Sequence, residues 1–169
     1  MLDGRWIVRD GRWSVSGRRS CEDGAIEDAT TQTRLDPASG ERFVALRRQL
    51  GVTSFGINQI VLQPGQRGRI HRHERQEEVY LVLEGCLTLV IEAEPVELTE
   101  GELIRVPAPV RRQLVNHGPG RLVLLALGGG GGEHQSRDAQ AFAAWEQRDG
   151  VPPTELANPA DLDPADLRR

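Results

Sequence analysis

The sequence predicts an all-β fold, either a barrel or a sandwich, within a chain of 169 residues. Between residues 41 and 127, short apolar runs alternate with turns that contain Gly, Pro or Asn, which is the pattern of consecutive short strands. Hydrophobic residues make up 38% of the chain but aromatic residues only 4%, so the core must be aliphatic. The length suits one domain with extensions at its ends.

The central part, residues 41–127, is predicted to be a series of strands. Several of them end at a glycine-containing turn, such as Pro64-Gly65 or Glu84-Gly85. The expected strands are residues 42–50, 55–63, 68–73, 78–83, 86–92, 96–98, 103–106, 111–115 and 121–127.

Residues 1–40 are predicted to be an N-terminal extension. Asp10-Gly11 separates two β-prone runs at residues 6–8 and 13–15, which is typical of a β-hairpin. Residues 21–40 are polar and indicate a loop.

Residues 128–169 are predicted to be a C-terminal extension. Five consecutive glycines at residues 128–132 indicate a flexible connector. Residues 151–169 are rich in proline and predict an extended tail that lies on the domain or on a partner.

The segment between connector and tail, residues 138–148, is rich in Ala, Gln and Glu. It places Phe142 and Trp145 three positions apart, on one face of a helix. The pattern predicts a short amphipathic helix that is capped by Ser136 or Asp138.

Charge and composition exclude several classes of partner. The net charge is −4, from 21 basic and 25 acidic residues, so we expect no nucleic-acid partner. All 21 basic residues are arginine. No apolar run has the length of a membrane span or a signal peptide, and the two cysteines lie far apart. We therefore expect a cytoplasmic protein with free thiols and no membrane partner.

The strongest functional signal is the pair His71 and His73, followed by Glu78. Residues i and i+2 of a strand point to the same side, so both imidazoles can face the interior of one barrel. Glu78 begins the next expected strand and can add a carboxylate, and Tyr80 shares its side. Two imidazoles and one carboxylate leave open positions on a transition metal such as iron, and other divalent ions also fit this ligand set.

The spacing around these residues resembles the first motif of the cupin superfamily. Gly65 is followed by five residues, then by His71-Arg72-His73, then by Glu78, with Gly85 seven positions further on. The start of the second cupin motif is similar to Gly101 through Pro107, and Asn116 falls at its end.

The resemblance covers residues 41–127 and implies a small single-domain cupin. The implied fold is a double-stranded β-helix (a jelly-roll, or cupin, barrel), with the N-terminal hairpin and the short C-terminal helix added to it. The family implies dioxygenase-like or isomerase-like chemistry on a small polar or anionic molecule, and a homodimer. His71, His73 and Glu78 would hold a divalent Fe, Mn, Ni or Zn ion.

The second motif departs from the family at two positions. Pro109 stands where the family has a glycine, and Arg112 stands where the family has its fourth ligand, a histidine. Arginine stays protonated and offers no lone pair to a metal. His117 cannot replace that ligand, because it lies five residues on and falls on the opposite strand face.

Arg112 leaves several interpretations open. Three ligands can still hold a metal, with Arg112 orienting an acidic substrate and Tyr80 donating a hydrogen bond or a proton as the catalytic pair. Alternatively, Arg112 replaces the metal and forms an inert ion pair with Glu78. A third reading is a metal-free, non-catalytic binding or sensor cupin in which Arg112 binds an anionic ligand.

Overall fold

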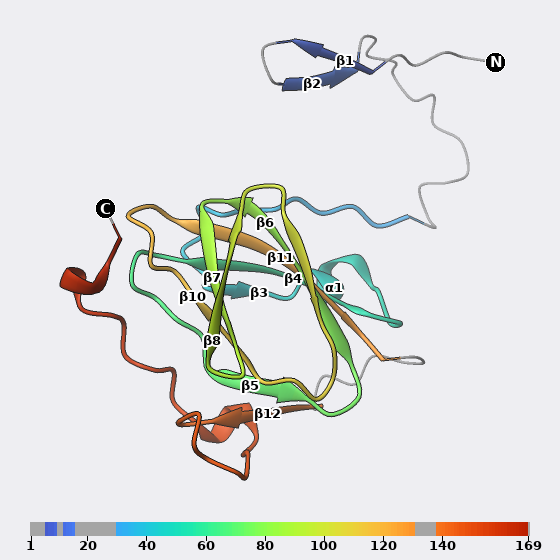
Figure 1. The fold of residues 1–169 in the computed structure, drawn as a ribbon. Helices are drawn as coiled ribbons and strands as arrows, with labels where there is room; N and C mark the ends of the chain where they lie inside the picture. The colour runs from blue at the N-terminus through green and yellow to red at the C-terminus, as the bar shows by residue number, and fades with distance from the viewer. Residues whose placement is uncertain (1–5, 10–11, 16–29, 131–137, 169) are drawn as a thin grey trace. The chain divides into compact units, whose positions relative to one another are not determined.

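Two five-stranded antiparallel sheets form the framework of residues 43–142 (Figure 1). The structure is a computed structural model that describes residues 6–9, 12–15, 30–130 and 138–168. The first sheet contains, in spatial order, β12 (Ala139–Phe142), β5 (Ile70–His73), β10 (Arg112–Val115), β7 (Cys86–Ile91) and β8 (Glu94–Thr99). The second contains β3 (Phe43–Val44), β4 (Gly56–Leu62), β11 (Leu122–Gly129), β6 (Glu77–Glu84) and β9 (Leu103–Val106).

The core lies between the two sheets and is aliphatic, as expected. Leu87 and Leu89 of the first sheet, and Leu122 and Leu124 of the second, are completely buried in one cluster. Burying such a side chain contributes about 1.5–3 kcal/mol relative to leaving it exposed. The predicted double-stranded β-helix is confirmed.

The motif glycines occupy turns that need their backbone freedom. Gly65 and Gly85 have φ angles of 81° and 85°, in the left-handed region that favours glycine. A Cβ atom on Gly85 would lie 2.6 Å from the carbonyl oxygen of Arg121. The glycine spacing in the sequence therefore reports the turns that flank the strands.

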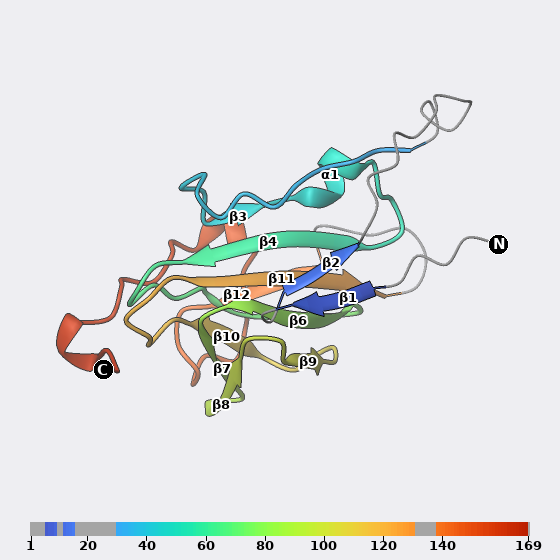
Figure 2. The same cartoon turned by 90° about the horizontal axis from the view of Figure 1, so that it is seen from above.

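The prediction of one strand over residues 42–50 is wrong. The segment forms the two-residue strand β3 and then a helix, α1 (Leu46–Leu50), which ends at Gly51 with a φ of 69°. Leu, Arg and Gln favour a helix over a strand, and no β-branched residue follows Val44 in this run. The helix is anchored by the buried Leu46 and packs beside β4 (Figures 1 and 2).

The predicted helix over residues 138–148 is also wrong. Its first half is the strand β12, which pairs with β5 from Ala139 opposite His73 to Phe142 opposite Ile70. Residues after Phe142 form bends and turns. The free edge of β5 offers backbone hydrogen bonds to this segment, and that pairing outweighs a local helical preference. Ser136, the other expected cap, lies outside the described residues.

The prediction that residue 128 begins a flexible connector is wrong for its first two glycines. Gly128 and Gly129 end β11 and pair with Glu78 and Glu77 of β6. A Cβ atom on Gly128 would lie 3.4 Å from Cγ of Glu78. A side chain longer than a methyl group at residue 128 would therefore press against Glu78.

The N-terminal strands β1 (Trp6–Arg9) and β2 (Arg12–Val15) pair antiparallel, as the hairpin prediction requires. Residues 1–30 form one compact unit, and residues 31–169 form another. No helix in the described parts of the chain is long and apolar enough to cross a membrane.

The C-terminal tail lies along the second unit in extended form, interrupted by the short 3₁₀ turns η1 (Pro153–Glu155) and η2 (Pro164–Asp166). Nε of Arg69 donates to the carbonyl of Leu156 at 2.7 Å, and the amide of Leu162 donates to the carbonyl of Gly65 at 2.8 Å. These bonds hold the tail against the segment that leads into β5.

Candidate metal centre

Three side chains from two strands converge inside the barrel. His71 and His73 lie on β5 and Glu78 lies on β6, so the group joins the two sheets. The two imidazole rings stand at 90° to each other, with their centroids 5.6 Å apart. The predicted alternation is therefore realised, with both histidines directed toward one carboxylate.

The distances within this group suit a transition-metal ion. Nε2 of His71 lies 3.5 Å from Oε2 of Glu78, and Nε2 of His73 lies 3.3 Å from Oε1. Metal bonds to nitrogen and oxygen of about 2.0–2.2 Å place neighbouring ligand atoms about 2.8–3.6 Å apart. Both separations fall in this interval.

Hydrogen bonds on the far side of each ring orient the imidazoles. Nδ1 of His71 lies 3.1 Å from the carbonyl oxygen of Arg69, which accepts a hydrogen bond from it. Nδ1 of His73 contacts the Gln76 amide and lies 3.7 Å from Oδ2 of Asp138. A proton held on Nδ1 of His71 leaves its Nε2 lone pair directed at Glu78, as metal-ligating histidines require. In His73, Nδ1 accepts from the side-chain amide nitrogen of Gln76.

The chemistry of this donor set favours a bound cation. A lone pair on Nε2 cannot face a carboxylate favourably unless a proton or a metal lies between them. With Nδ1 of His71 already donating to a carbonyl, a second proton would make this ring an imidazolium. A metal ion would satisfy the Nε2 lone pair of His71 and the carboxylate together, and His73 would join them with its proton on Nδ1, beside Asp138. These residues therefore fit the group that they would hold.

Gln76 and Asp138 support the site but were not predicted to do so. Oδ2 of Asp138 accepts hydrogen bonds from the backbone amides of Arg75 and Gln76, at 3.1 and 3.0 Å. Burial alone would raise the pKa of Asp138, but these bonds and the nearby charges of His73 and Arg75 lower it. In the sequence, the only signal at Asp138 was that of a helix cap.

Arg112 pairs with Glu78, which is one of the interpretations that the sequence left open, and does not line the cavity. Its side chain is completely buried, and Nη2 donates to Oε2 of Glu78 at 2.8 Å. Nη1 donates to the carbonyl of Val110 at 2.8 Å, and Nε lies 3.5 Å from the hydroxyl of Tyr80. The guanidinium is not among the groups that line the cavity, so it positions the Glu78 carboxylate.

Tyr80 is buried beside this pair and donates its hydroxyl proton to Oε2 of Glu78. Burial and the charge of Glu78 raise the pKa of Tyr80 well above its usual value, so the hydroxyl stays protonated. Burial would raise the pKa of Glu78, but the neighbouring His71, His73 and Arg112 hold it well below its usual value. Glu78 is therefore a carboxylate with fixed donors on one oxygen.

A cavity of about 530 Å³ opens above the three ligands. Gly56 of β4 and Gly128 of β11 stand in the same row as Glu78, and Ala126 stands beside Tyr80 in the next row. These small residues leave the space beside the ligands empty of side chains. The cavity is lined by residues of both sheets, of α1 and of the tail, among them Arg42, Arg47, Arg48, Asn58, Arg69 and Pro153.

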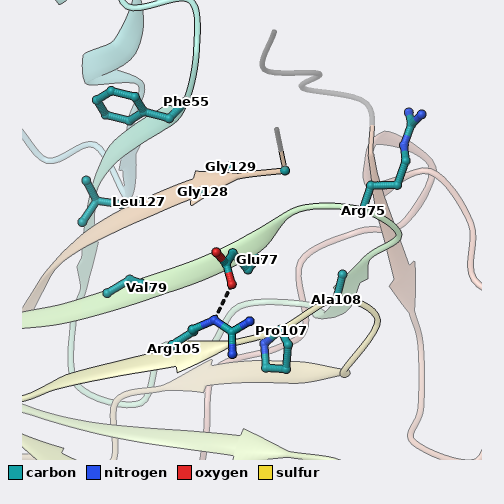
Figure 3. Close-up of a pocket in the computed structure, with 11 residues that line it drawn as sticks. Phe55, Arg75, Glu77, Val79, Arg105, Pro107, Ala108, Leu127, Gly128 and Gly129 are labelled. Atoms are coloured by element: carbon teal, nitrogen blue, oxygen red, sulfur yellow. Dashed lines mark hydrogen bonds and ion pairs between the residues drawn. The ribbon is translucent and has the colours of Figure 1, made fainter. Parts of the chain in front are cut away.

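Glu77 faces a different hollow, shown in Figure 3, and pairs there with Arg105. The sheet alternation thus separates Glu77 from Glu78, as expected, and excludes a catalytic pair of these carboxylates. His117 is bonded through Nδ1 to the hydroxyl of Thr88 at 3.0 Å. Within residues 30–130 and 138–168, His71, His73 and Glu78 form the one group with metal-ligand geometry.

Asn116 at the end of the second motif has a structural role. Its side-chain amide donates to the carbonyls of Leu62 and Gly120, at 2.9 and 2.8 Å, and its oxygen accepts from the amide of Gly118 at 2.9 Å. The side chain closes the turn between β10 and β11.

Part of the chain is similar to a known family of domains. Residues 58–128 match the family model described as "Cupin domain". No curated protein matches the chain.

Solved structures share the fold. A protein from Acidithiobacillus ferrooxidans, provisionally described as a sugar phosphate isomerase, is 25% identical with a TM-score of 0.51, over 59% of this chain and 63% of that one. A cupin-superfamily sugar phosphate isomerase from Silicibacter pomeroyi is 23% identical with a TM-score of 0.53, over 74% of each chain. A cupin protein from Bacteroides fragilis is 19% identical with a TM-score of 0.53, over 72% of this chain and 98% of that one.

Proposed function

We propose that the cupin domain of this chain, residues 58–128, binds a divalent transition metal and uses it to act on a small polar or anionic molecule. The metal ligands are His71, His73 and Glu78. The observation that carries the proposal is the approach of two imidazole Nε2 atoms to one carboxylate, at 3.5 and 3.3 Å.

The chemistry we propose is isomerase-like. A divalent ion held by three protein ligands keeps open positions and acts as a Lewis acid on a hydroxyl or carbonyl oxygen. The cavity above the ligands has the volume of a small-molecule site. The description of the Acidithiobacillus ferrooxidans protein supports an isomerase, and the same ligand set also suits dioxygenase-like chemistry.

In this proposal, Tyr80 and Arg112 act through Glu78. Their two donors fix Oε2, and Oε1 remains directed at His73. The carboxylate then keeps one orientation whether or not substrate is present. This is a positioning role, in place of the direct contact with substrate that the sequence suggested for Arg112.

A second candidate is a metal-free binding or sensor module, and the 2.8 Å pair between Arg112 and Glu78 favours it. This pair already neutralises the carboxylate. A divalent ion about 4 Å from the guanidinium would be repelled by about 8 kcal/mol at an effective dielectric constant of 20. The ligands must therefore outweigh a repulsion that the family histidine would not cause.

Metal analysis decides between the two candidates. The purified chain is stripped with a chelator, reconstituted separately with iron, manganese, nickel and zinc, and analysed by mass spectrometry. We expect about one ion per chain for at least one metal. The double variant His71→Ala/His73→Ala should bind none, and His117→Ala, which removes a histidine outside the site, should bind as the parent does. If the parent chain takes up none of the four metals, the metal-dependent function is rejected and the metal-free binding or sensor module remains.

We further propose a homodimer, as family resemblance implies. Light scattering after gel filtration should give twice the chain mass of 18.7 kDa. A mass of one chain at micromolar concentration would contradict it.

A further inference from the structure

We propose that Arg47 and Arg48 of α1 form an oxyanion subsite in the cavity, which receives the phosphate of a phosphorylated small molecule. The other end of that molecule would reach the metal ligands, and this part of the inference rests on the proposed function. The subsite itself depends only on the arginines and the cavity.

The lining of the cavity carries an excess of positive charge. Four arginines line it, together with His71, His73 and the single carboxylate of Glu78. That carboxylate is already paired with Arg112, which does not line the cavity. A concave site with one sign of charge raises the local concentration of ligands of the opposite sign. The ligand is therefore expected to be an anion.

Two of the four arginines are occupied by the tail. Nη2 of Arg42 lies 3.7 Å from a carboxylate oxygen of Asp161, and Nε of Arg69 donates to the carbonyl of Leu156 at 2.7 Å. These contacts hold residues of the tail over the cavity, where Pro153 also lines it. Arg42 and Arg69 thus shape the wall of the cavity.

Arg47 and Arg48 remain available for a ligand. Neither side chain forms a hydrogen bond or an ion pair with the described part of the chain, although both line the cavity. The Asn58 amide, on the inward face of β4, is likewise without a partner among the described residues. The three side chains offer unused donors in the same space as the metal ligands.

The backbone of these arginines is fixed in place. Leu46, the residue before them, is 2% exposed, and the helix packs on β4. A guanidinium presents a planar fork of donors that matches the oxygens of phosphate in pairs. Two guanidiniums that line the same cavity suit a dianion with three oxygens better than a single carboxylate. Carboxylates and phosphates are both oxyanions that guanidiniums bind, and we propose a phosphate monoester as the ligand.

Calorimetric titration of the full-length, metal-stripped chain at low salt tests the subsite, with methyl phosphate and acetate as probes. Metal is removed so that the probe cannot bind to it. We expect methyl phosphate to bind more tightly than acetate, and Arg47→Gln/Arg48→Gln to weaken methyl phosphate at least tenfold. The matched control Arg148→Gln, which removes an exposed arginine that lines no described cavity, should bind as the parent does. Tighter binding of acetate than of methyl phosphate would contradict the proposed phosphate and indicate a carboxylate ligand.

Two further measurements separate this inference from the proposed function. His71→Ala/His73→Ala should lose metal and keep methyl phosphate binding within about twofold. Arg47→Gln/Arg48→Gln should keep metal and the parent's melting temperature. Absence of binding to the parent, or equal binding to the parent and the arginine variant, would overturn the subsite even where metal analysis succeeds. Failure of metal uptake alone would overturn the proposed function and leave the subsite standing.

Discussion

The Arg112 guanidinium donates to Oε2 of Glu78 at 2.8 Å and is completely buried, without lining the cavity. Tyr80 donates to the same oxygen, and His73 faces the other oxygen at 3.3 Å. Arg112 therefore does not itself offer a donor atom to a metal but binds Glu78. It holds Glu78 in place and adds a positive charge near any metal.

Arg112→Met should weaken the fold and strengthen metal binding. Removing one partner of a buried ion pair typically costs about 3–5 kcal/mol, because the other charge stays buried alone. A bound metal would compensate that charge and would no longer be repelled by the guanidinium. Urea denaturation of the stripped protein, with metal titration of the native protein, checks both parts.

Arg121→Met is the matched control for this change. Arg121 pairs with Glu84, also on β6, at 2.7 Å, but both side chains are partly exposed. Exposed pairs contribute about 0–1 kcal/mol, so this variant should lose little stability. Equal losses in the two variants, or unchanged metal affinity in Arg112→Met, would contradict the role assigned to Arg112.

Gly128→Val should lower metal affinity at least tenfold. A Cβ atom at residue 128 would lie 3.4 Å from Cγ of Glu78 and 3.5 Å from Oε1 of Gln76, so a branched side chain must displace them. Gly129→Val is the control, because its Cβ atom would face Phe55 at 3.7 Å. Metal titration of both variants is the measurement, and equal affinities would show that Gly128 does not protect the site.

The stabilising contribution of Asp138 should depend on pH. Its folded-state pKa is lowered, so the contribution is present above the unfolded value of about 3.9 and is lost as the pH falls through the folded pKa. Asp138→Asn should lose about 1.5–3 kcal/mol at pH 7, the size of hydrogen bonds to a charged group.

The difference between parent and Asp138→Asn should shrink as the pH falls below 3.9, which urea denaturation at pH 7 and near pH 3 measures. Asp149→Asn, which changes an exposed aspartate, is the control and should alter stability by no more than about 0.5 kcal/mol. A constant difference for Asp138→Asn would mean that its charge does not stabilise the turn.

Phe142→Ala should destabilise the edge strand β12 and its neighbour β5, which carries His71 and His73. The ring is 2% exposed and lies under the guanidiniums of Arg72 and Arg111, with centroid distances of 5.4 and 5.6 Å. Loss of a buried phenylalanine costs about 3–5 kcal/mol. We expect faster hydrogen exchange at β5 and β12, with smaller effects from Trp145→Ala, whose ring is only half-buried. Unchanged exchange at β5 would show that β12 does not support the ligand strand.

Local rules explain which parts of the fold and site could be predicted. Strand boundaries near Gly65 and Gly85 follow from turns that need a positive φ, and the facing of His71 and His73 follows from a strand period of two. Residues 139–142 could not be predicted in the same way. Their strand depends on pairing with β5, more than sixty residues earlier in the chain, as in Ala139 opposite His73.

The sequence by itself determined a barrel of short strands and the grouping of His71, His73 and Glu78, because glycine turns, strand alternation and residue chemistry are local properties. Only the tertiary structure decided what Arg112 does, since its target Glu78 lies on the opposite sheet. The tertiary structure also decided the role of Asp138, which precedes β12 and lies beside His73. It likewise decided the position of Arg47 and Arg48, which α1 brings to the cavity. Packing between distant segments sets these contacts, and no local pattern in the chain encodes them.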